Sequence, residues 1–333
     1  MNCCTSQKAV ATTEVEAPKS STAGRISTDS SMSSSTDSNT SVSEKAVFDA
    51  AFKELAEELA TKGSIDAGKV SKTIAEMNAV HQTITKYFPK AMPAKEVLEK
   101  VKPVLTKYGF TDDNTLYAQS VCPDEINHQE GDTPELFATY LGEVFHMGGL
   151  AGIPFTGKTG FGAFSHHVPD GGHCFVLMAP HIGLSESGKL GSYTRIGQTH
   201  DGSCCGAVVG ALGHCLAGKT VPDMSDPASA DDLQMGFIIN QIKAHQKEIE
   251  EAGKDGDNAM QAKASLVTHD FARDMLNKVV STNFGDVNSL LVLFTGIQIN
   301  MPNPFDGYFQ PISMEIRDKK GKTIDIFAEC FGK

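Results

Sequence analysis

The spacing of apolar residues along the first third of the chain predicts a series of amphipathic helices. Between about residues 44 and 108, apolar side chains recur every three or four positions, which places them on one face of an α-helix. We expect these N-terminal helices to pack their apolar faces against a central sheet. The recurring apolar residues are Val47, Phe48, Ala51, Leu55 and Leu59, then Val70, Ile74, Met77 and Val80, then Val97, Val101, Val104 and Leu105.

After Cys122 the pattern alternates between strands and helices. A short continuous apolar run such as 175–178 is typical of a buried strand, whereas longer segments between such runs have the helical period. This alternation predicts an α/β fold, with a central sheet flanked by helices and no internal repeat. The later helices are expected at 135–146, 205–216, 231–251 and 265–280, and the late strands at 290–300, 311–317 and 323–328.

Residues 1–45 differ from the rest of the chain. They are rich in Ser and Thr and contain few large apolar side chains, so we predict a disordered tail followed by one domain over residues 46–333. The tail lacks the apolar segment of a secretory signal, and its one arginine, Arg25, disfavours a transit peptide. Cys3 and Cys4 are candidate lipidation sites, but the Met-Asn start lacks the glycine that myristoylation needs, which favours an unmodified tail.

Charge and cysteine content narrow the class of protein. A formal net charge of -12 without a cluster of Lys and Arg argues against a nucleic-acid partner. No apolar run approaches the roughly 18 residues that a membrane helix needs, so we expect no membrane span. The eight cysteines are irregularly spaced, which indicates a reducing compartment where free thiols can bind metals. We therefore predict a cytoplasmic protein, with the chloroplast as the alternative.

Three cysteine and histidine residues stand at the ends of predicted elements. Cys122 follows an extended stretch, His181 follows an apolar strand, and Cys205 begins a helix rich in Gly and Ala. In an open α/β sheet such positions meet at the carboxyl edge of the strands, and a helix N-terminus lowers the pKa of a thiol. Two cysteines and one histidine suit Zn²⁺ and leave a fourth position open, as in catalytic sites. The alternative from residue types alone is that these are ordinary buried side chains.

Longer strings of sequence point to one family. The chain carries CPDEIN at 122–127, FHMGGLAGIPF at 145–155, GFGAFSHHVP at 160–169, APHIG at 179–183, GQ at 197–198 and CGA at 205–207. In this order they resemble the limiting-CO2-inducible B/C family of microalgae and bacteria, also called the theta-class carbonic anhydrases. The resemblance spans about residues 46–333. It implies a fold like that of the beta-class carbonic anhydrases, a zinc enzyme that interconverts CO2 and bicarbonate in a carbon-concentrating mechanism, and a homodimer.

Carried over residue by residue, the resemblance implies a ligand set and a catalytic carboxylate. Cys122, His181 and Cys205 would bind the zinc, and Asp124 would be the carboxylate two residues after the first ligand. Cys204 would replace Cys205 if the helix register shifted by one residue, but the glycine that follows Cys205 matches the family pattern.

The beta-class motif also contains an arginine, where this chain has Ile126. The arginine that pairs with Asp124 must then come from elsewhere, and Arg195 is the candidate because it lies between two predicted ligands. In the implied mechanism a zinc hydroxide attacks CO2, Asp124 orients it, and Arg195 keeps Asp124 ionised. Candidate proton relays are His128, His166, His167 and His173.

Two other functions are alternatives. Residues 152–159 fit the phosphate-binding pattern G-x-x-x-x-G-K-[ST], but we expect a helix before this segment and helix-breaking glycines after it, which does not suit the motif. The other alternative is a zinc-stabilised protein that acts by association or binds bicarbonate without turnover. The pairing of Asp124 with an arginine favours an enzyme, since a binding protein has no need of it.

Overall fold

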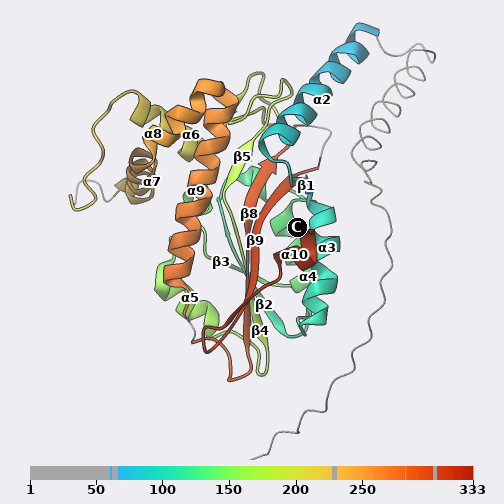
Figure 1. Cartoon of the computed structure of the whole chain (residues 1–333), viewed down its shortest axis with the longest axis vertical. Coiled ribbons are helices and arrows are strands. Elements are labelled where there is room, and N and C mark those ends of the chain that lie inside the picture. Colours follow the sequence, from blue (N-terminus) through green and yellow to red (C-terminus); the bar gives the residue numbers. More distant parts are fainter. Residues whose placement is uncertain (1–60, 62–66, 227–230, 282, 303–305, 333) are drawn as a thin grey trace, which may run out of the picture. The chain divides into compact units, whose positions relative to one another are not determined.

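A mixed β-sheet lies at the centre of the fold. The computed structural model describes residues 61, 67–226, 231–281, 283–302 and 306–332. The main path of the sheet has the order β1-β9-β8-β4-β2-β3, with β10 beside β9 and β5 beside β8. Helices cover both of its faces (Figure 1), which confirms the predicted α/β class. The strands of this sheet are β1 (Met92–Pro93), β2 (Thr115–Val121), β3 (Val144–His146), β4 (His173–Ala179), β5 (His181–Gly183), β8 (Leu290–Asn300), β9 (Tyr308–Asp318) and β10 (Thr323–Asp325).

The direction of the strands divides the sheet into two parts. β3, β2, β4 and β8 run parallel to one another, and β5 also runs parallel to β8. β9 is antiparallel to β8, and β1 and β10 are antiparallel to β9. The carboxyl ends of β2, β4 and β8 therefore meet at one edge, where an α/β fold places its binding sites.

Alternation of apolar side chains along the buried strands explains why both faces are covered. In β8, Leu291 and Leu293 belong to one apolar core, whereas Val292 and Phe294 belong to another on the opposite face. Successive side chains of a strand point to opposite faces, so a strand that is apolar at every position needs a helical layer on each side.

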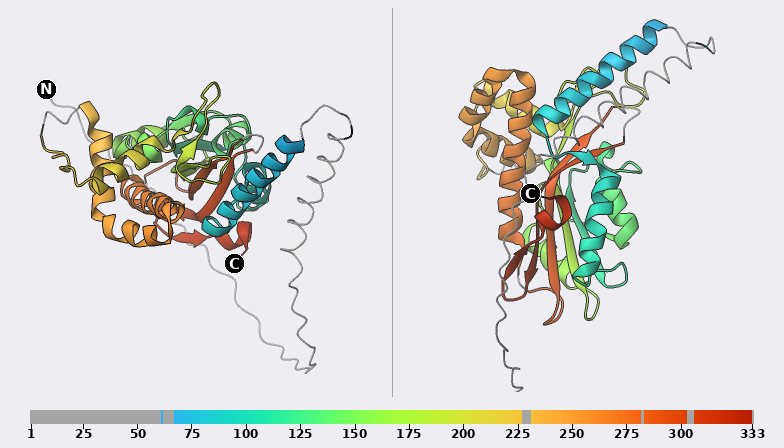
Figure 2. Two further views of the ribbon diagram at one scale, coloured as in Figure 1. Left: turned by 90° about the horizontal axis from the view of Figure 1, so that it is seen from above. Right: turned by 45° about the vertical axis from the view of Figure 1, so that its right-hand side comes forward.

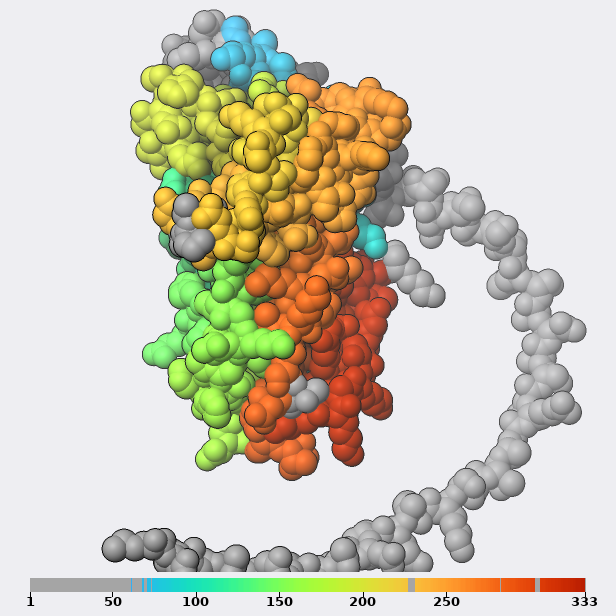
Figure 3. Space-filling model, turned by 90° about the vertical axis from the view of Figure 1, so that its left-hand side faces the viewer, coloured from blue at the N-terminus to red at the C-terminus, as the bar shows by residue number. Residues whose placement is uncertain are grey.

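Each helical layer has its own set of helices. Figure 2 shows the sheet between the two layers from other directions, and Figure 3 shows the outer surface of the larger layer. α2 packs at the end of the sheet against β5 and β8, through an apolar cluster that includes Val80, Ile84 and Ile299. The smaller layer contains α3 (Ala94–Lys107), α4 (Thr133–Leu141) and α10 (Phe327–Phe331); the larger contains α5 (Gly157–Ser165), α6 (Gly206–Leu216), α7 (Leu233–Ala244), α8 (Gln246–Ala252) and α9 (Asp257–Val279); α2 is Ala67–Tyr87.

Several predicted elements differ in detail. The expected helix 231–251 is two helices, because the backbone of His245 leaves the helical conformation between α7 and α8. The expected helix 135–146 ends at Leu141, where Gly142 has a positive φ of 90°, and the strand β3 follows. The expected strand 323–328 ends at Asp325, whose side chain accepts a hydrogen bond from the Phe327 N–H at the start of α10. The predicted tail 1–45 and the first apolar repeat, 47–59, lie outside the described residues.

None of the helices in the described part of the chain combines the length and the apolar character needed to cross a lipid bilayer.

Two glycines hold the segment after β3 against the ends of β2 and β4. A Cβ atom on Gly148 would lie 2.2 Å from the Val121 carbonyl oxygen, and one on Gly152 would lie 2.5 Å from the Ala179 carbonyl oxygen. The Ser120 hydroxyl also donates a hydrogen bond to the Gly152 carbonyl, at 2.9 Å. Only glycine allows this close approach, and Gly152 also has a positive φ of 71°. The segment therefore supports the two strand ends immediately before Cys122 and His181.

We predict that Gly152→Ala lowers the free energy of unfolding by about 2 kcal/mol or more, because it combines a backbone clash with an unfavourable φ. Gly213→Ala is the matched control, since a Cβ atom there meets nothing within 4 Å inside α6. The control should be neutral or slightly stabilising, because alanine is the better helix former. Chemical denaturation of the two variants measures the difference, and equal stability would contradict this account of the segment.

Candidate metal centre

The register of β2 and β4 brings Cys122 and His181 together. Val121, the last residue of β2, pairs with Ala179, the last residue of β4. Cys122 and His181 follow directly beyond these ends, and both side chains are buried. The ligand atoms of Cys122, His181 and Cys205 all lie within 4.8 Å of one another. The three residues that the sequence predicted as ligands thus form one buried cluster.

Cys205 reaches the cluster from the start of α6, where it is the N-cap residue. The preceding residue is held to β5 by a 3.0 Å hydrogen bond from the Gly183 N–H to the Cys204 carbonyl. The pKa of the Cys205 thiol is below its usual value, because the Cys122 thiol and the N–H groups of Val208 and Ala207 hydrogen-bond to it and outweigh its burial. The hydrogen bond to Cys205, together with burial, raises the pKa of Cys122. Cys205 is therefore the first of the two thiols to become a thiolate.

A fixed hydrogen-bond chain determines the orientation of His181. Its Nδ1 lies 2.8 Å from Oδ1 of Asn300, the last residue of β8. The Asn300 amide nitrogen donates to the Ile126 carbonyl at 3.0 Å and to Asn127 Oδ1 at 3.2 Å. Oδ1 of Asn300 is therefore the acceptor, and Nδ1 of His181 carries the proton. When the ring carries a single proton, its lone pair is therefore on Nε2.

That lone pair has no partner within the described residues. His181 Nε2 is fully buried and makes no hydrogen bond. An unpaired buried acceptor costs about 1–3 kcal/mol, so such a group calls for an explanation. A Zn²⁺ ion bound by Nε2 and by the thiolates of Cys122 and Cys205 supplies one, because imidazole nitrogen and thiolate sulfur are the ligands that zinc prefers. The residues present fit a zinc ion that three protein side chains would hold.

Asp124 and Arg195 form an ion pair beside this cluster. Nη2 of Arg195 lies 3.1 Å from Oδ1 and 2.9 Å from Oδ2 of Asp124, and its Nε donates to Glu125 Oε1 at 2.8 Å. The side chain of Asp124 is 14% exposed and that of Arg195 is 23% exposed, so solvent screens the pair only in part. Arg195 is thus paired with Asp124 in the structure, and its role as the replacement for an arginine at position 126 stays a prediction.

The Asp124 carboxylate also faces the cluster of Cys122, His181 and Cys205. Its Oδ2 lies 3.9 Å from Nε2 of His181. Burial by itself raises the pKa of Asp124, but the charge of a protonated His181 and the hydrogen bonds from Arg195 outweigh it and hold the pKa below its ordinary value. A bound cation would supply a positive charge in the same place, so it would also favour the ionised form of Asp124.

Arg195 is supplied by a hairpin far from Asp124 in the sequence. The hairpin consists of β6 (Ser192–Tyr193), β7 (Gly202–Ser203) and the loop between them. Asp201 accepts hydrogen bonds from the hydroxyls of Ser192 and Thr194, which closes the base of the loop. The hairpin therefore fixes the direction from which the guanidinium group approaches Asp124.

Cys204 has a different role from its neighbour. Its thiol donates to Asn300 Oδ1 at 3.5 Å and lies 3.7 Å from Nδ1 of His181, on the protonated side of the ring. Asp124, His181 and Cys204 form a second group that could hold a metal, but Cys204 lies beside Nδ1, the ring nitrogen that donates to Asn300. The hydrogen bond from His181 to Asn300 therefore favours Cys205 as the ligand.

Three of the four predicted proton relays lie far from the cluster. His173 begins β4, eight residues before His181, which corresponds to roughly 26 Å of extended strand. His166 and His167 follow α5, in the connection that leads to His173. A relay role for these three does not fit the structure. His128 lies next to the candidate centre in sequence and pairs with Glu135 at 3.0 Å.

The segment 152–159 is built into the fold in a way that the sequence did not predict. A helix, α5, does follow it from Gly157; within this helix Gly160 packs closely on Thr156, whereas a Cβ atom on Gly162 would meet nothing within 4 Å. A strand, β3, also precedes it. Gly152, however, is used for packing against β4, and its carbonyl accepts a hydrogen bond from Ser120. The segment supports the strand ends, and this use of Gly152 argues against phosphate binding even though a strand precedes the segment and a helix follows it.

Sequence reasoning missed two residues of the site. Asn300 orients His181, and Glu125 shares Arg195 with Asp124. Asn300 ends a strand that was predicted correctly, so a polar residue at the carboxyl edge was the available signal. Glu125 pairs with Arg195 of the distant hairpin, and only the folded chain shows this contact.

Comparisons with known proteins agree with this geometry. The family model described as limiting CO2-inducible proteins B/C beta carbonic anhydrases matches residues 91–318. The crystal structure of PtLCIB4, a homolog of the limiting CO2-inducible protein LCIB, has a TM-score of 0.65 and 30% identity, covering 74% of this chain and 99% of that chain. A histidine-to-alanine mutant of PtLCIB4 has a TM-score of 0.67 and 29% identity, covering 75% of this chain and 98% of that chain.

The structure of LCIB itself shares the fold, with a TM-score of 0.57 and 20% identity over 74% of this chain and 98% of that chain. No curated protein sequence matches the chain significantly. The family match covers more than half of the chain, within the region that carries all three cluster residues. The chain therefore belongs to the family of limiting CO2-inducible proteins B/C beta carbonic anhydrases.

Proposed function

We propose that this protein is a zinc-dependent carbonic anhydrase that interconverts CO2 and bicarbonate. The observation that carries the proposal is the buried, unpartnered Nε2 of His181, which faces the thiols of Cys122 and Cys205. Membership of a carbonic anhydrase family supports the reaction, and the Asp124–Arg195 pair supports turnover over binding alone.

The residues of the site divide the chemistry between them. Zn²⁺ held by Cys122, His181 and Cys205 would lower the pKa of a bound water to about 7, and so supply a nucleophile for CO2 at neutral pH. The two thiolates would balance the charge of the cation. Asp124 would act as a hydrogen-bond acceptor beside these ligands.

Arg195 and Asn300 act on the two residues that they contact. Arg195 keeps Asp124 ionised and fixes the plane of its carboxylate through two hydrogen bonds. Asn300 keeps the proton of His181 on Nδ1, so that Nε2 stays available. His128, paired with Glu135, is the remaining candidate for passing a proton to solvent.

Two further expectations from the family stay proposals. We propose a homodimer and a role in inorganic-carbon handling, in the cytoplasm or the chloroplast. The alternative at the same site is a zinc protein that binds bicarbonate or a partner without turnover, and an activity measurement separates the two.

We predict that the purified protein carries close to one zinc ion per chain and hydrates CO2, and that a chelator removes both. Replacing Cys122, His181 or Cys205 with Ala should each remove most of the zinc, because a site that loses one of three protein ligands binds the metal weakly. Cys215→Ala is the matched control, since Cys215 is equally buried but lies in α6 away from the cluster. Metal analysis and stopped-flow hydration assays measure the two properties.

Zinc retained without hydration would support the binding alternative, and loss of zinc in Cys204→Ala but not in Cys205→Ala would reverse the ligand assignment.

We predict that Asp124 and Arg195 act as one unit. Asp124→Asn should retain zinc yet lower kcat/KM by on the order of 10² or more, because the oriented acceptor is lost. Arg195→Ala should also retain zinc and lose activity. The double variant should be hardly slower than the slower single variant, since each change disables the same interaction. Losses that multiply in the double variant would show that the two residues work independently.

We predict that Asn300→Leu weakens zinc binding by roughly 10- to 100-fold, because His181 loses the acceptor that fixes its proton on Nδ1. Asn300→Asp keeps that acceptor and should retain most of the affinity. Asn240→Leu is the control, since Asn240 makes two comparable hydrogen bonds, to Pro222 and Gly236, in α7. Chelator competition measures the zinc affinity of each variant. Equal affinities of Asn300→Leu and the control would refute the positioning role.

A further inference from the structure

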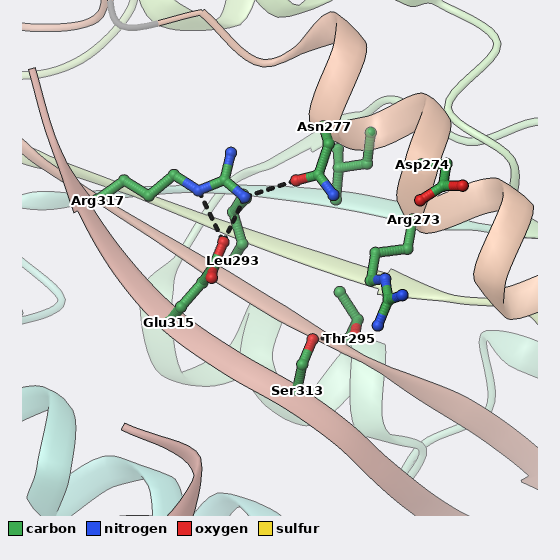
Figure 4. A pocket seen from close by; sticks show the side chains of 9 residues that line it. Arg273, Asp274, Asn277, Leu293, Thr295, Ser313, Glu315 and Arg317 are labelled. Carbon is green, nitrogen blue, oxygen red and sulfur yellow. Dashed lines mark hydrogen bonds and ion pairs between the residues drawn. The ribbon is translucent and has the colours of Figure 1, made fainter. Parts of the chain in front are cut away.

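A pocket of about 260 Å³ lies between α9 and the strands β8 and β9, apart from the metal centre (Figure 4). Arg273 and Asn277 reach it from α9, whereas Thr295 and Ser313 reach it from the strands. Thr295 is five residues before Asn300 on β8, which corresponds to roughly 16 Å along the strand. The pocket therefore does not share residues with the candidate zinc site.

A chain of buried polar groups ends in this pocket. His269 on α9 is completely buried, with Nδ1 3.1 Å from Asp270 Oδ1 and Nε2 3.0 Å from the Thr295 hydroxyl. Thr295 Oγ1 in turn lies 2.6 Å from Ser313 Oγ. Burial lowers the pKa of His269, so the ring is neutral and carries one proton.

The direction of these hydrogen bonds follows from their first acceptor. The Asp270 carboxylate can only accept, so Nδ1 of His269 donates to it and Nε2 accepts from Thr295. The single proton of the Thr295 hydroxyl is then used, and Ser313 must donate its own proton to Thr295. The oxygen of Ser313 is left with free lone pairs toward the pocket, where it serves as a hydrogen-bond acceptor.

Arg273 brings a positive charge to the same place. It lies one helical turn after His269, and its guanidinium group points from α9 toward Thr295 and Ser313 (Figure 4). Its one ion pair among the described residues is the 3.9 Å contact with Asp270, whose carboxylate already accepts from His269. Asp274 also lines the pocket, but the described residues include no ion pair between it and Arg273. Arg273 is thus a strong donor without a close acceptor.

The opposite wall adds a neutral donor. Arg317 is paired with Glu315, and its Nη2 donates to Asn277 Oδ1 at 2.5 Å. The pair with Glu315 cancels the charge of Arg317. The hydrogen bond from Arg317 fixes the Asn277 amide with its oxygen toward Arg317. The NH2 group of Asn277 is therefore the end of that amide available to a ligand.

From these groups we propose that the pocket binds a singly charged oxyanion that also carries a hydroxyl group. The anionic oxygens pair with Arg273 and the Asn277 amide, and the hydroxyl donates to Ser313. Bicarbonate is the smallest anion of this kind, and a small 2-hydroxycarboxylate is a larger one that a pocket of this size can hold. This binding is separate from chemistry at the metal centre and does not depend on it.

Isothermal titration of the full-length protein with lactate, bicarbonate and propionate tests the proposal. Lactate or bicarbonate should bind to the wild-type protein, and propionate should bind roughly three- to ten-fold more weakly than lactate, because it lacks the hydroxyl group for Ser313. Ser313→Ala should remove the preference for lactate over propionate. Arg273→Gln should weaken lactate binding by roughly ten-fold or more, since it removes a charge-assisted hydrogen bond.

Lys278→Gln is the matched control, because it removes a positive charge from an exposed position of the same helix outside the pocket. It should bind lactate like the wild-type protein, which separates a specific site from general charge attraction. Unchanged melting temperatures of the ligand-free variants confirm that they are folded. The proposal is wrong if neither lactate nor bicarbonate binds, if lactate and propionate bind equally well, or if Arg273→Gln and Lys278→Gln have the same effect.

Discussion

The parallel pairing of β2 with β4 is the constraint on which the rest of the structure depends. It places the residues after Val121 and after Ala179 side by side at one edge of the sheet. A shift of either strand by one residue would turn the side chains of that strand to the wrong faces and separate Cys122 from His181. The apolar cores on both faces of the sheet hold the register, and thereby the cluster.

Most of the buried polar groups around the cluster have hydrogen-bond partners, but Nε2 of His181 has none among the described residues. Asn300 is satisfied by His181, Ile126 and Asn127, and Asp124 is satisfied by Arg195. Pairing is usual for buried polar groups, and the described residues have three exceptions: Nε2 of His181, Oγ1 of Thr133 and Oε1 of Gln298. Of these three residues, only His181 belongs to a group of potential metal ligands, which distinguishes it from an ordinary polar interior.

The sequence was sufficient for those features that depend on neighbouring residues. The strand 290–300 and the helix from residue 205 follow from local apolar patterns, and Cys122, His181 and Cys205 stand at the ends of such elements. The strand β3 was missed, because a three-residue strand after a helix lacks a periodic pattern of its own. Asn300 was missed for a different reason, since its role exists only through contacts with residues more than a hundred positions away.

The position of Asn300 has a consequence for how the protein is made. The residues of the cluster have all left the ribosome soon after residue 205 is synthesised, but the group that fixes the His181 tautomer arrives with the end of β8, almost a hundred residues later. β8 also lies between β4 and β9, so the sheet cannot close without it. A growing chain thus presents both thiols and an unoriented imidazole while residues 206–300 are synthesised, and His181 gains the partner that fixes its ring only after that.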